Sequence, residues 1–395
     1  MLNIEQPGNY RVSLLHLGFR PFFLLAGVYA LVSMGLWAWL YHGAVTILPM
    51  GLPPALWHAH EMVFGYALAV IAGFLLTAVR NWTGVQTAHG MPLLLLALFW
   101  VAARVLAWVP GAVALMAVLD LAFNLALLIA VLHPVLKARQ WKQLPVLALP
   151  LVLTLAHLVF YAGLFGGLAG GERLGIHAGL YLVVLLILVM GRRVIPFFIE
   201  KGVDGPAAIR NRLWVDVGTV VLAVVFVVLQ LLPSWPQLAG GIALLLALLQ
   251  AVRLYDWHHP DIWRKPLLWS LYLALAWLAL GFALYALGQY TPLDGFAALH
   301  AFAYGGIGLV TLGMMCRVSL GHTGRNVFAP PRSVTWMLAL VVLGAMVRVL
   351  GPLLLPAAHV HWIGISQGLW LAGFGLFVVV YAPMLVRPRI DGRYG

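Results

Sequence analysis

Long apolar runs recur from near the start of the chain to its end, and they decide its fold class. A run of about 20 apolar residues is long enough to cross a bilayer as a helix. Hydrophobic residues make up 64% of the chain and charged residues only 9%, whereas soluble domains are about half apolar. The sequence therefore predicts an all-α polytopic membrane protein with about twelve transmembrane helices. The predicted spans are 21–41, 55–79, 91–109, 112–134, 144–166, 174–190, 213–232, 237–255, 267–289, 295–316, 334–355 and 360–386.

Basic residues are distributed unevenly among the loops between these spans. One set of alternate loops carries nearly all of the arginines and lysines, whereas the opposite loops hold only Arg173. The positive-inside rule therefore predicts that both termini are cytoplasmic. The same distribution explains the formal net charge of +12 without a nucleic-acid partner.

Part of the chain repeats. The stretch that begins at His60, HEMVFGYALAVIAGFLLTAVRNWTG, aligns without a gap with the one that begins at His300, HAFAYGGIGLVTLGMMCRVSLGHTG. Downstream, ARVL around Arg104 matches VRVL around Arg348, and GIHAGLYLVVLLILVMGRRVIPFF places His177 at a similar depth of the sixth span. We expect a single transmembrane domain over residues 1–395, built from three pseudo-threefold four-helix units at approximately 14–142, 143–262 and 263–390.

Each of these units carries a histidine near the outer end of its second helix. If the three second helices meet around a pseudo-threefold axis, His60, His177 and His300 converge in the outer half of the membrane. Neutral imidazoles suit copper, zinc and iron, and paired histidines commonly ligate haem. The single cysteine, Cys316, excludes Cys-rich metal sites. The sequence thus predicts a histidine-bound metal or haem, with His58 as a further candidate metal ligand.

Two arginines, Arg104 and Arg348, lie deep within predicted spans. A buried arginine needs an anionic partner, and at this depth the chain offers chiefly Glu61 and Asp120. Haem propionates would supply two more anions, so both arginines are candidate cofactor-binding residues. His157 has no partner in the repeat, and we interpret it as a hydrogen-bonded packing residue.

Five short motifs make the chain resemble a known family. FRPFF at 19–23, WHAHEM at 57–62, NWTG at 81–84, GRRVIPFF at 191–198 and LGHTGR at 320–325 together resemble the NnrS family of haem- and copper-containing membrane proteins. The resemblance implies twelve helices, bound haem b and copper, a bacterial inner-membrane location and a role in tolerance of nitric oxide. Carried over by motif, it singles out His58, His60, Glu61, His300, His322 and Arg325.

A looser similarity links the chain to the main subunit of the haem-copper oxidases and nitric oxide reductases, which also arranges twelve helices as three arcs of four. His177 and Tyr181 have the His-x-x-x-Tyr spacing of some of its members. The pattern then breaks, because the span 213–232 contains no histidine and the span 295–316 contains only His300. A copper bound as in that subunit is therefore excluded.

We therefore expect an inner-membrane protein that binds nitric oxide or a related nitrosyl species and either converts or removes it. Glu61 is the predicted catalytic residue, carrying protons inward from the periplasm. The sequence identifies no electron donor and leaves open whether the chain is an oxidoreductase. One alternative is a twelve-helix secondary transporter, which the four-helix repeat and off-centre polar residues disfavour. The other is a non-catalytic haem-based protein that binds or senses nitric oxide.

Overall fold

The computed structural model of the chain describes residues 12–43, 47–205, 207–232 and 234–395. In these ranges all regular structure is helical, without a strand. Eleven helices are long and apolar enough to cross a membrane by length and composition, and Met91–Leu106 is a shorter apolar helix. The prediction of an all-α polytopic membrane protein is thus confirmed. Residues 1–11 of the predicted domain 1–395 lie outside the described residues.

Every predicted span corresponds to a helix or to a run of joined helices. The α-helices are α1 Phe19–His42, α2 Pro54–His60, α3 Leu68–Thr83, α4 Met91–Leu106, α5 Val113–Lys137, α6 Leu144–Leu164, α7 Gly171–Gly202, α8 Leu213–Leu231, α9 Pro236–Trp257, α10 Pro266–Gly288, α11 Gly295–His300, α12 Leu309–His322, α13 Arg332–Leu354 and α14 His359–Val386. Short 3-10 helices are η1 Ser13–Leu15, η2 Pro49–Gly51, η4 Trp141–Gln143, η5 Pro260–Arg264 and η7 Pro356–Ala358.

The helix α4 is shorter than its predicted span, 91–109. It ends at Leu106, and the chain then turns through Pro110 and Gly111, where Gly111 has a φ of +78°. A left-handed backbone of this kind favours glycine. The helix therefore ends a few residues before the end of the apolar run from which its span was predicted.

Rows of large apolar side chains face outward from several helices. Ile129 on α5 is 66% exposed, Leu213 on α8 is 71% exposed, and Val379 on α14 is 74% exposed. Monomeric soluble proteins rarely expose extensive apolar patches. These rows are the surface expected to contact lipid in a membrane protein.

The described chain forms two compact units. The first contains the described residues of Met1–Gly179 together with Val318–Asn326 and Phe377–Gly395, and the second contains Leu180–Arg317 and Val327–Leu376. The division falls inside α7, α12 and α14. The predicted three-unit repeat is a different grouping, and it stays a prediction.

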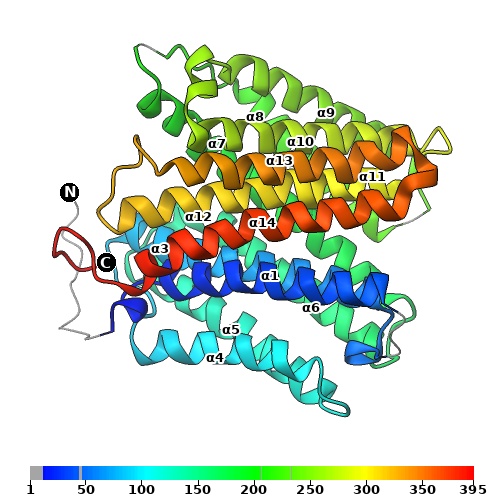
Figure 1. The fold of residues 1–395 in the computed structure, drawn as a ribbon, viewed down its shortest axis with the longest axis horizontal. Coiled ribbons are helices and arrows are strands. Elements are labelled where there is room, and N and C mark those ends of the chain that lie inside the picture. The colour runs from blue at the N-terminus through cyan, green and yellow to red at the C-terminus, as the bar shows by residue number, and fades with distance from the viewer. Residues whose placement is uncertain (1–11, 44–46, 206, 233) are drawn as a thin grey trace. The chain divides into compact units, whose positions relative to one another are not determined.

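Each unit is a set of closely packed helices (Figure 1). In the first unit, α5 packs against α3, α4 and α6, while α1 packs against α3. In the second unit, α10 packs against α9 and α11, α8 packs against α9, and α11 packs against α13. The central place of α5 in the first unit makes it the helix from which polar side chains can reach several neighbours.

Two spans contain a π-helix directly after a histidine. In the first unit η3, Glu61–Ala67, follows His60 and joins α2 to α3. In the second unit η6, Ala301–Gly308, follows His300 and joins α11 to α12. The sequence repeat aligns these two histidines, so the two repeated segments also share a π-helix at the same position. Single π turns inside α-helices occur frequently at functional sites.

Candidate metal centre

A polar cluster lies inside the first unit. Its acid and imidazole side chains, His60, Glu61, Asp120 and His157, are all 0% exposed. Tyr29, Arg104, Asn124 and Tyr161 contact them directly. We call these eight residues the buried polar cluster. Ionisable groups inside transmembrane helices are costly, and they usually mark a function.

A glycine in the π-helix η3 allows this cluster to close. A Cβ atom on Gly65 would lie 2.8 Å from Oε2 of Glu61, 2.9 Å from Nη1 of Arg104 and 2.9 Å from Cε1 of Tyr29. Distances below 3 Å between such atoms require one of them to move. The carbonyl oxygen of Gly65 also accepts a hydrogen bond from Nε1 of Trp100 at 3.1 Å. Only glycine permits this approach of side chains to the helix backbone.

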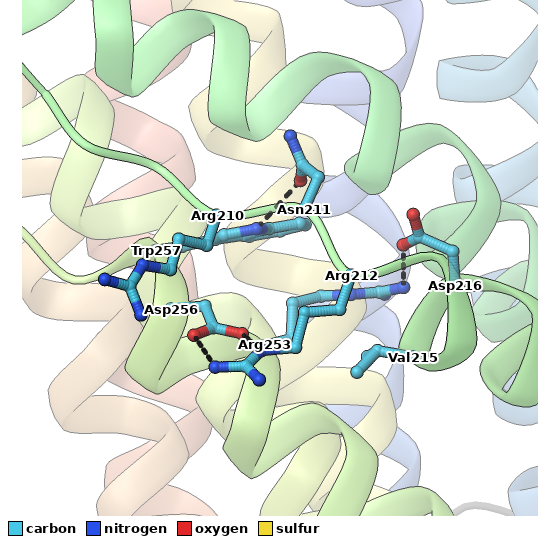
Figure 2. A pocket seen from close by; sticks show the side chains of 8 residues that line it. All are labelled: Arg210, Asn211, Arg212, Val215, Asp216, Arg253, Asp256 and Trp257. Carbon is cyan, nitrogen blue, oxygen red and sulfur yellow. Dashed lines mark hydrogen bonds and ion pairs between the residues drawn. The ribbon is translucent and has the colours of Figure 1, made fainter.

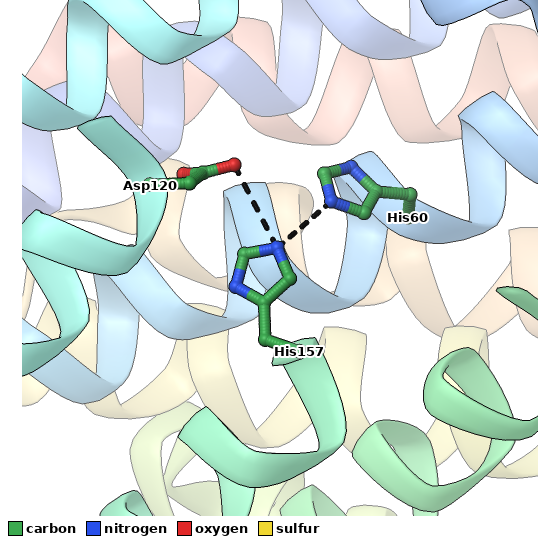
Figure 3. Close-up of side chains that lie close together, drawn as sticks. All are labelled: His60, Asp120 and His157. Atoms are coloured by element: carbon green, nitrogen blue, oxygen red, sulfur yellow. Dashed lines mark hydrogen bonds and ion pairs between the residues drawn. The ribbon is translucent and has the colours of Figure 1, made fainter. Parts of the chain in front are cut away.

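Three members of the cluster have the geometry of a metal site (Figure 3). Nε2 of His60 lies 3.0 Å from Nε2 of His157, and Nε2 of His157 lies 3.7 Å from Oδ2 of Asp120. One ligand atom from each of the three residues lies within 4.8 Å of the other two. Two imidazoles and a carboxylate are a donor set that suits divalent transition metals.

The hydrogen bonds of the cluster fit one arrangement of protons. The Asn124 amide donates to Nδ1 of His157 at 2.9 Å, which places the His157 proton on Nε2. That N–H then donates to Nε2 of His60, and Nδ1 of His60 donates to Oε1 of Glu61 at 2.9 Å. Both imidazoles are then neutral, and a hydrogen-bonded chain runs from α5 through α6 and α2 to η3.

Arg104 lies between the two carboxylates of the cluster. Its guanidinium is 3.0 Å from Oε2 of Glu61 and also pairs with Oδ2 of Asp120. Tyr29 donates a hydrogen bond to Glu61, and Tyr161 donates to Asp120 at 2.7 Å. Glu61 and Asp120, the acids that the sequence offers at this depth, are thus the partners of Arg104 in the structure, and its predicted role in binding a cofactor stays a prediction.

The ionic groups of the cluster do not balance. With both histidines neutral, two carboxylates face one guanidinium, so the cluster carries a net charge of about −1. A buried uncompensated charge is strongly unfavourable. A bound cation or one additional proton on the histidine pair would neutralise it.

Several buried polar atoms of the cluster lack a hydrogen-bond partner among the described residues. They are Oδ1 of Asp120, Oδ1 of Asn124, and Nε and Nη1 of Arg104. Native proteins leave few such atoms unpaired, and each requires an explanation. The two oxygens are additional electron-pair donors beside the histidines, which again favours a cation.

Aromatic rings enclose the histidine pair. The ring of Phe64 stacks on that of His157, with centroids 4.0 Å apart and an interplanar angle of 2°, and the Phe160 ring lies 4.3 Å from that of His60. The two Nε2 atoms are therefore held facing one another within a packed aromatic shell. This arrangement suits a single ion between the rings rather than a large planar group.

Two other predicted ligands, His177 and His300, each make the same kind of backbone hydrogen bond. In each, Nδ1 donates to the carbonyl oxygen four residues earlier at 2.8 Å, from Arg173 and Phe296 respectively. This bond leaves Nε2 with its lone pair, the form in which a histidine binds a metal. Nε2 of His300 lies 3.1 Å from Nη2 of Arg348. The predicted convergence of His60, His177 and His300 stays a prediction.

The remaining predicted residues lie apart from the histidine pair. The half-buried ring of His58 stacks on Trp37, with centroids 4.6 Å apart. His322 lies at the end of α12, where its ring is 5.5 Å from that of Phe19 and its carbonyl accepts from Arg389 at 2.8 Å. Nη1 of Arg325 is buried and has no hydrogen-bond partner in the described chain.

Sequence reasoning missed four members of the cluster, namely Tyr29, Asn124, His157 and Tyr161. Interpreting His157 as a hydrogen-bonded packing residue left out its contact with His60. A signal was present: Asp120 with Asn124, and His157 with Tyr161, are polar pairs four residues apart within apolar spans. Such pairs lie on one face of a helix, and two polar faces at similar depth in neighbouring spans predict a contact.

These features define a polytopic membrane protein with an ionisable centre buried among its helices. Residues 13–389 match the model of the family described as NnrS protein, so the chain belongs to the NnrS family. Membership makes it a membrane protein of the nitric oxide response. No curated protein matches the chain.

Proposed function

We propose that this chain is a haem- and copper-containing protein of the bacterial inner membrane, with both termini cytoplasmic, that binds nitric oxide or a nitrosyl species and converts or removes it. The observation that carries the proposal is the pair of Nε2 atoms of His60 and His157, 3.0 Å apart beside Asp120. The family match supports the link to nitric oxide. The lipid bilayer and an electron donor of unknown identity are the proposed further partners.

The buried polar cluster fits copper in both its donors and its charge. Imidazole nitrogens suit copper, and the unpaired oxygens of Asp120 and Asn124 lie in the same cluster. The net charge of about −1 would be balanced by one Cu(I) ion. His60, His157 and Asp120 are the proposed ligands, and Asn124 and Glu61 orient the two imidazoles through their Nδ1 atoms.

The same cluster does not fit a haem between its two histidines. Phe64 and Phe160 pack against the imidazole rings, and a macrocycle would have to displace them. His177 and His300 fit haem ligation better, because in each the Nδ1–H bond to a backbone carbonyl leaves Nε2 as the nitrogen that would bind iron, although in His300 this atom now contacts Arg348. Arg348 would then exchange its contact with His300 for a propionate. Arg104 already pairs with two carboxylates, which leaves it less suited to that role.

Bound copper or haem iron with an open coordination position would supply the point at which nitric oxide binds. The residues of the chain would control protons around that point. Glu61 holds the Nδ1 proton of His60 through Oε1 and accepts from Tyr29 through Oε2. It is fully buried, so a proton that reaches it from the periplasm must pass through neighbouring groups such as Tyr29.

A visible spectrum and metal analysis of the purified protein test the proposal. We expect haem absorption, bound copper, and a change in the spectrum of the reduced protein when nitric oxide is added. If the protein is an enzyme, it should consume nitric oxide over many turnovers when supplied with electrons, and Glu61→Gln should slow turnover while haem and copper remain bound. A colourless, metal-free protein would contradict the proposal and favour a transporter.

A further inference from the structure

A small pocket lies in the second unit where α8 begins and α9 ends (Figure 2). Arg210, Arg212, Arg253, Asp216 and Asp256 supply its charged lining. Its volume of about 10 Å³ is the space of one water molecule or one oxygen atom of a larger anion. We call it the arginine pocket. The buried polar cluster belongs to the first unit and shares no residue with it.

Ion pairs hold most of the arginines of this pocket in place. Arg212 binds both carboxylate oxygens of Asp256, at 2.6 and 3.0 Å. Asp216 accepts from Arg253 at 3.1 Å and, on its other oxygen, from Arg192 at 2.7 Å. The two-point contact of Arg212 fixes the plane of its guanidinium. Arg253 is held at two of its nitrogens, by Asp216 and by Gln250, so the pocket is built before any ligand arrives.

The charges around the pocket are not balanced. Four guanidinium groups, those of Arg192, Arg210, Arg212 and Arg253, face two carboxylates, which leaves a net charge of about +2. The exposed side chain of Arg210 makes no ion pair with any described residue. Among the described residues, only the charge of Asp256, which already pairs with Arg212, acts on Arg210 from nearby, so an anion that bound here would not have to break an ion pair of Arg210.

Buried donors at the pocket also lack acceptors. Arg253 is 3% exposed, and its Nε has no hydrogen-bond partner in the described ranges of the chain. The helix α8 begins beside it without a side-chain cap, because its N-cap residue is Arg212. The first N–H groups of a helix that lacks a cap can bind an anion. The buried Nε of Arg253 and the first N–H groups of α8 could therefore each donate a hydrogen bond to an oxygen atom of an anion.

The surroundings of the pocket are those of a membrane interface. Leu213, Trp214 and Tyr255 beside it are 71%, 57% and 80% exposed, and exposed valines continue along α8 at Val217, Val221 and Val224. Tryptophan and tyrosine prefer the headgroup region of a bilayer. An anion that carries acyl chains could place its charged group at the arginines and its chains along α8.

We propose that the arginine pocket binds the phosphate group of an anionic phospholipid. Arginine forms two-point hydrogen bonds with phosphate oxygens. The excess of basic residues at this end of the helices predicts that it faces the cytoplasm, where anionic headgroups attract arginine. Free inorganic phosphate offers the same oxygens, but it would leave the exposed apolar row of α8 without a part in binding.

The test compares lipids retained by the whole protein after reconstitution. The protein would be placed in nanodiscs that contain equal amounts of phosphatidylglycerol and phosphatidylcholine, and the lipids that stay bound on release would be counted by native mass spectrometry. We expect the wild type to retain phosphatidylglycerol preferentially. Arg210→Gln should reduce this preference about fivefold, which corresponds to about 1 kcal/mol per arginine near the surface.

The side chain of Arg210 is exposed and makes no ion pair within 4 Å in the described chain, so its substitution should leave the fold intact. Arg264→Gln removes the same charge from an arginine of the second unit whose side chain is 81% exposed and lies outside the pocket, and it should keep the preference. Equal loss in both variants, or a wild type without preference, would overturn the proposal. Displacement of phosphatidylglycerol by inorganic phosphate, but not by chloride at equal ionic strength, would assign the pocket to free phosphate and overturn its assignment to lipid.

Discussion

Nε2 of His60 lies 3.0 Å from Nε2 of His157, although 97 positions separate the two residues in the chain. Neither ring is exposed to solvent. In the neutral pair one nitrogen donates to the other. For a metal ion to bind both Nε2 atoms, this proton would have to move to Nδ1 of His157, where Oδ1 of a turned Asn124 amide would accept it. The proton would then stay in the cluster, and the metal ion would add its positive charge.

The first prediction concerns copper. His60→Ala and His157→Ala should each lower copper affinity by more than the roughly 10–100-fold that loss of an outer hydrogen-bond partner costs, because each removes a direct donor. Copper is measured by elemental analysis of the purified variants. His133→Ala, which changes an exposed histidine on α5, is the matched control and should retain copper.

His300→Ala distinguishes the buried polar cluster from the predicted convergence of His60, His177 and His300. If copper binds at the cluster, His300→Ala should keep copper and alter the haem spectrum. Loss of copper from His300→Ala together with normal copper in His157→Ala would place the metal elsewhere and refute the assignment.

The second prediction concerns the charge on Arg104. Arg104→Gln leaves the carboxylates of Glu61 and Asp120 without their shared cation, and breaking a buried pair in this way costs about 3–5 kcal/mol of unfolding free energy. The metal-free protein should be measured by reversible denaturation in detergent. Arg104→Gln/Asp120→Asn removes one acid as well and should recover part of the loss.

Arg173→Gln is the control for this experiment, because Arg173 is an exposed arginine of the same unit. It should change stability by no more than about 0.5 kcal/mol. A loss of the same size in Arg104→Gln and Arg173→Gln would show that the ion pairs of Arg104 contribute little.

The third prediction concerns Gly65. Gly65→Ala would bring a Cβ within 3 Å of Glu61, Arg104 and Tyr29, so the variant should lose about 1–3 kcal/mol through overpacking and bind less copper. Gly35→Ala on α1 is the matched control, since no atom lies within 4 Å of its added Cβ. Because alanine favours a helix over glycine, Gly35→Ala should be neutral or slightly stabilising. Thermal unfolding and copper analysis of both variants decide the point.

The fourth prediction concerns the segment after α14. Hydrogen bonds from the Arg389 guanidinium hold the pKa of the Asp391 carboxyl well below its usual range. Arg389 also donates to the carbonyl of His322, and the N–H of Ile390 bonds to the carbonyl of Thr323 at 3.3 Å. The carboxylate therefore contributes stability above its unfolded pKa of about 3.9, and this contribution is lost as pH falls through the lower folded pKa.

Hydrogen exchange of residues 387–395, corrected for the intrinsic pH dependence of exchange, measures this contribution. Protection in the wild type should fall at strongly acidic pH, and Asp391→Asn should already show the lower protection at neutral pH. Asp204→Asn, at an exposed aspartate of the second unit, should behave as the wild type. Identical protection in the wild type and Asp391→Asn would show that the ion pair between Arg389 and Asp391 does not stabilise this segment.

The course of the helices was predictable because bilayer-crossing length and apolar composition are properties of each segment by itself. The partners of Arg104 were predictable for a similar reason, since few acids lie at its depth. The contact between His60 and His157 was not, because it depends on the rotation of two helices about their axes. His157 also lacks a counterpart in the repeat, whereas His177 and His300 occupy positions that match His60.

The π-helices escaped prediction because no pattern of apolar residues distinguishes one wide turn from an α-helical turn. The aligned glycines, Gly65 and Gly305, were visible in the sequence, but the close contacts that require them were not. A Cβ on Gly65 would meet the buried polar cluster, and one on Gly305 would meet the ring of Trp277. Both close approaches arise only when neighbouring helices are packed.

The π-helix η3 also limits how the chain can change by insertion or deletion. A wide turn holds one residue more than an α-helical turn, and each residue of an α-helix advances the direction of a side chain by about 100°. Deleting one residue between Glu61 and Ala67 would let the span become a regular α-helix of nearly the same length. His60 would keep nearly its direction relative to α3, because the wide turn had absorbed the extra residue, whereas the side chains of the turn itself, including Gly65, would change direction. A single-codon deletion can therefore keep the membrane span and the direction of His60 while it removes the close approach of Glu61, Arg104 and Tyr29 to Gly65.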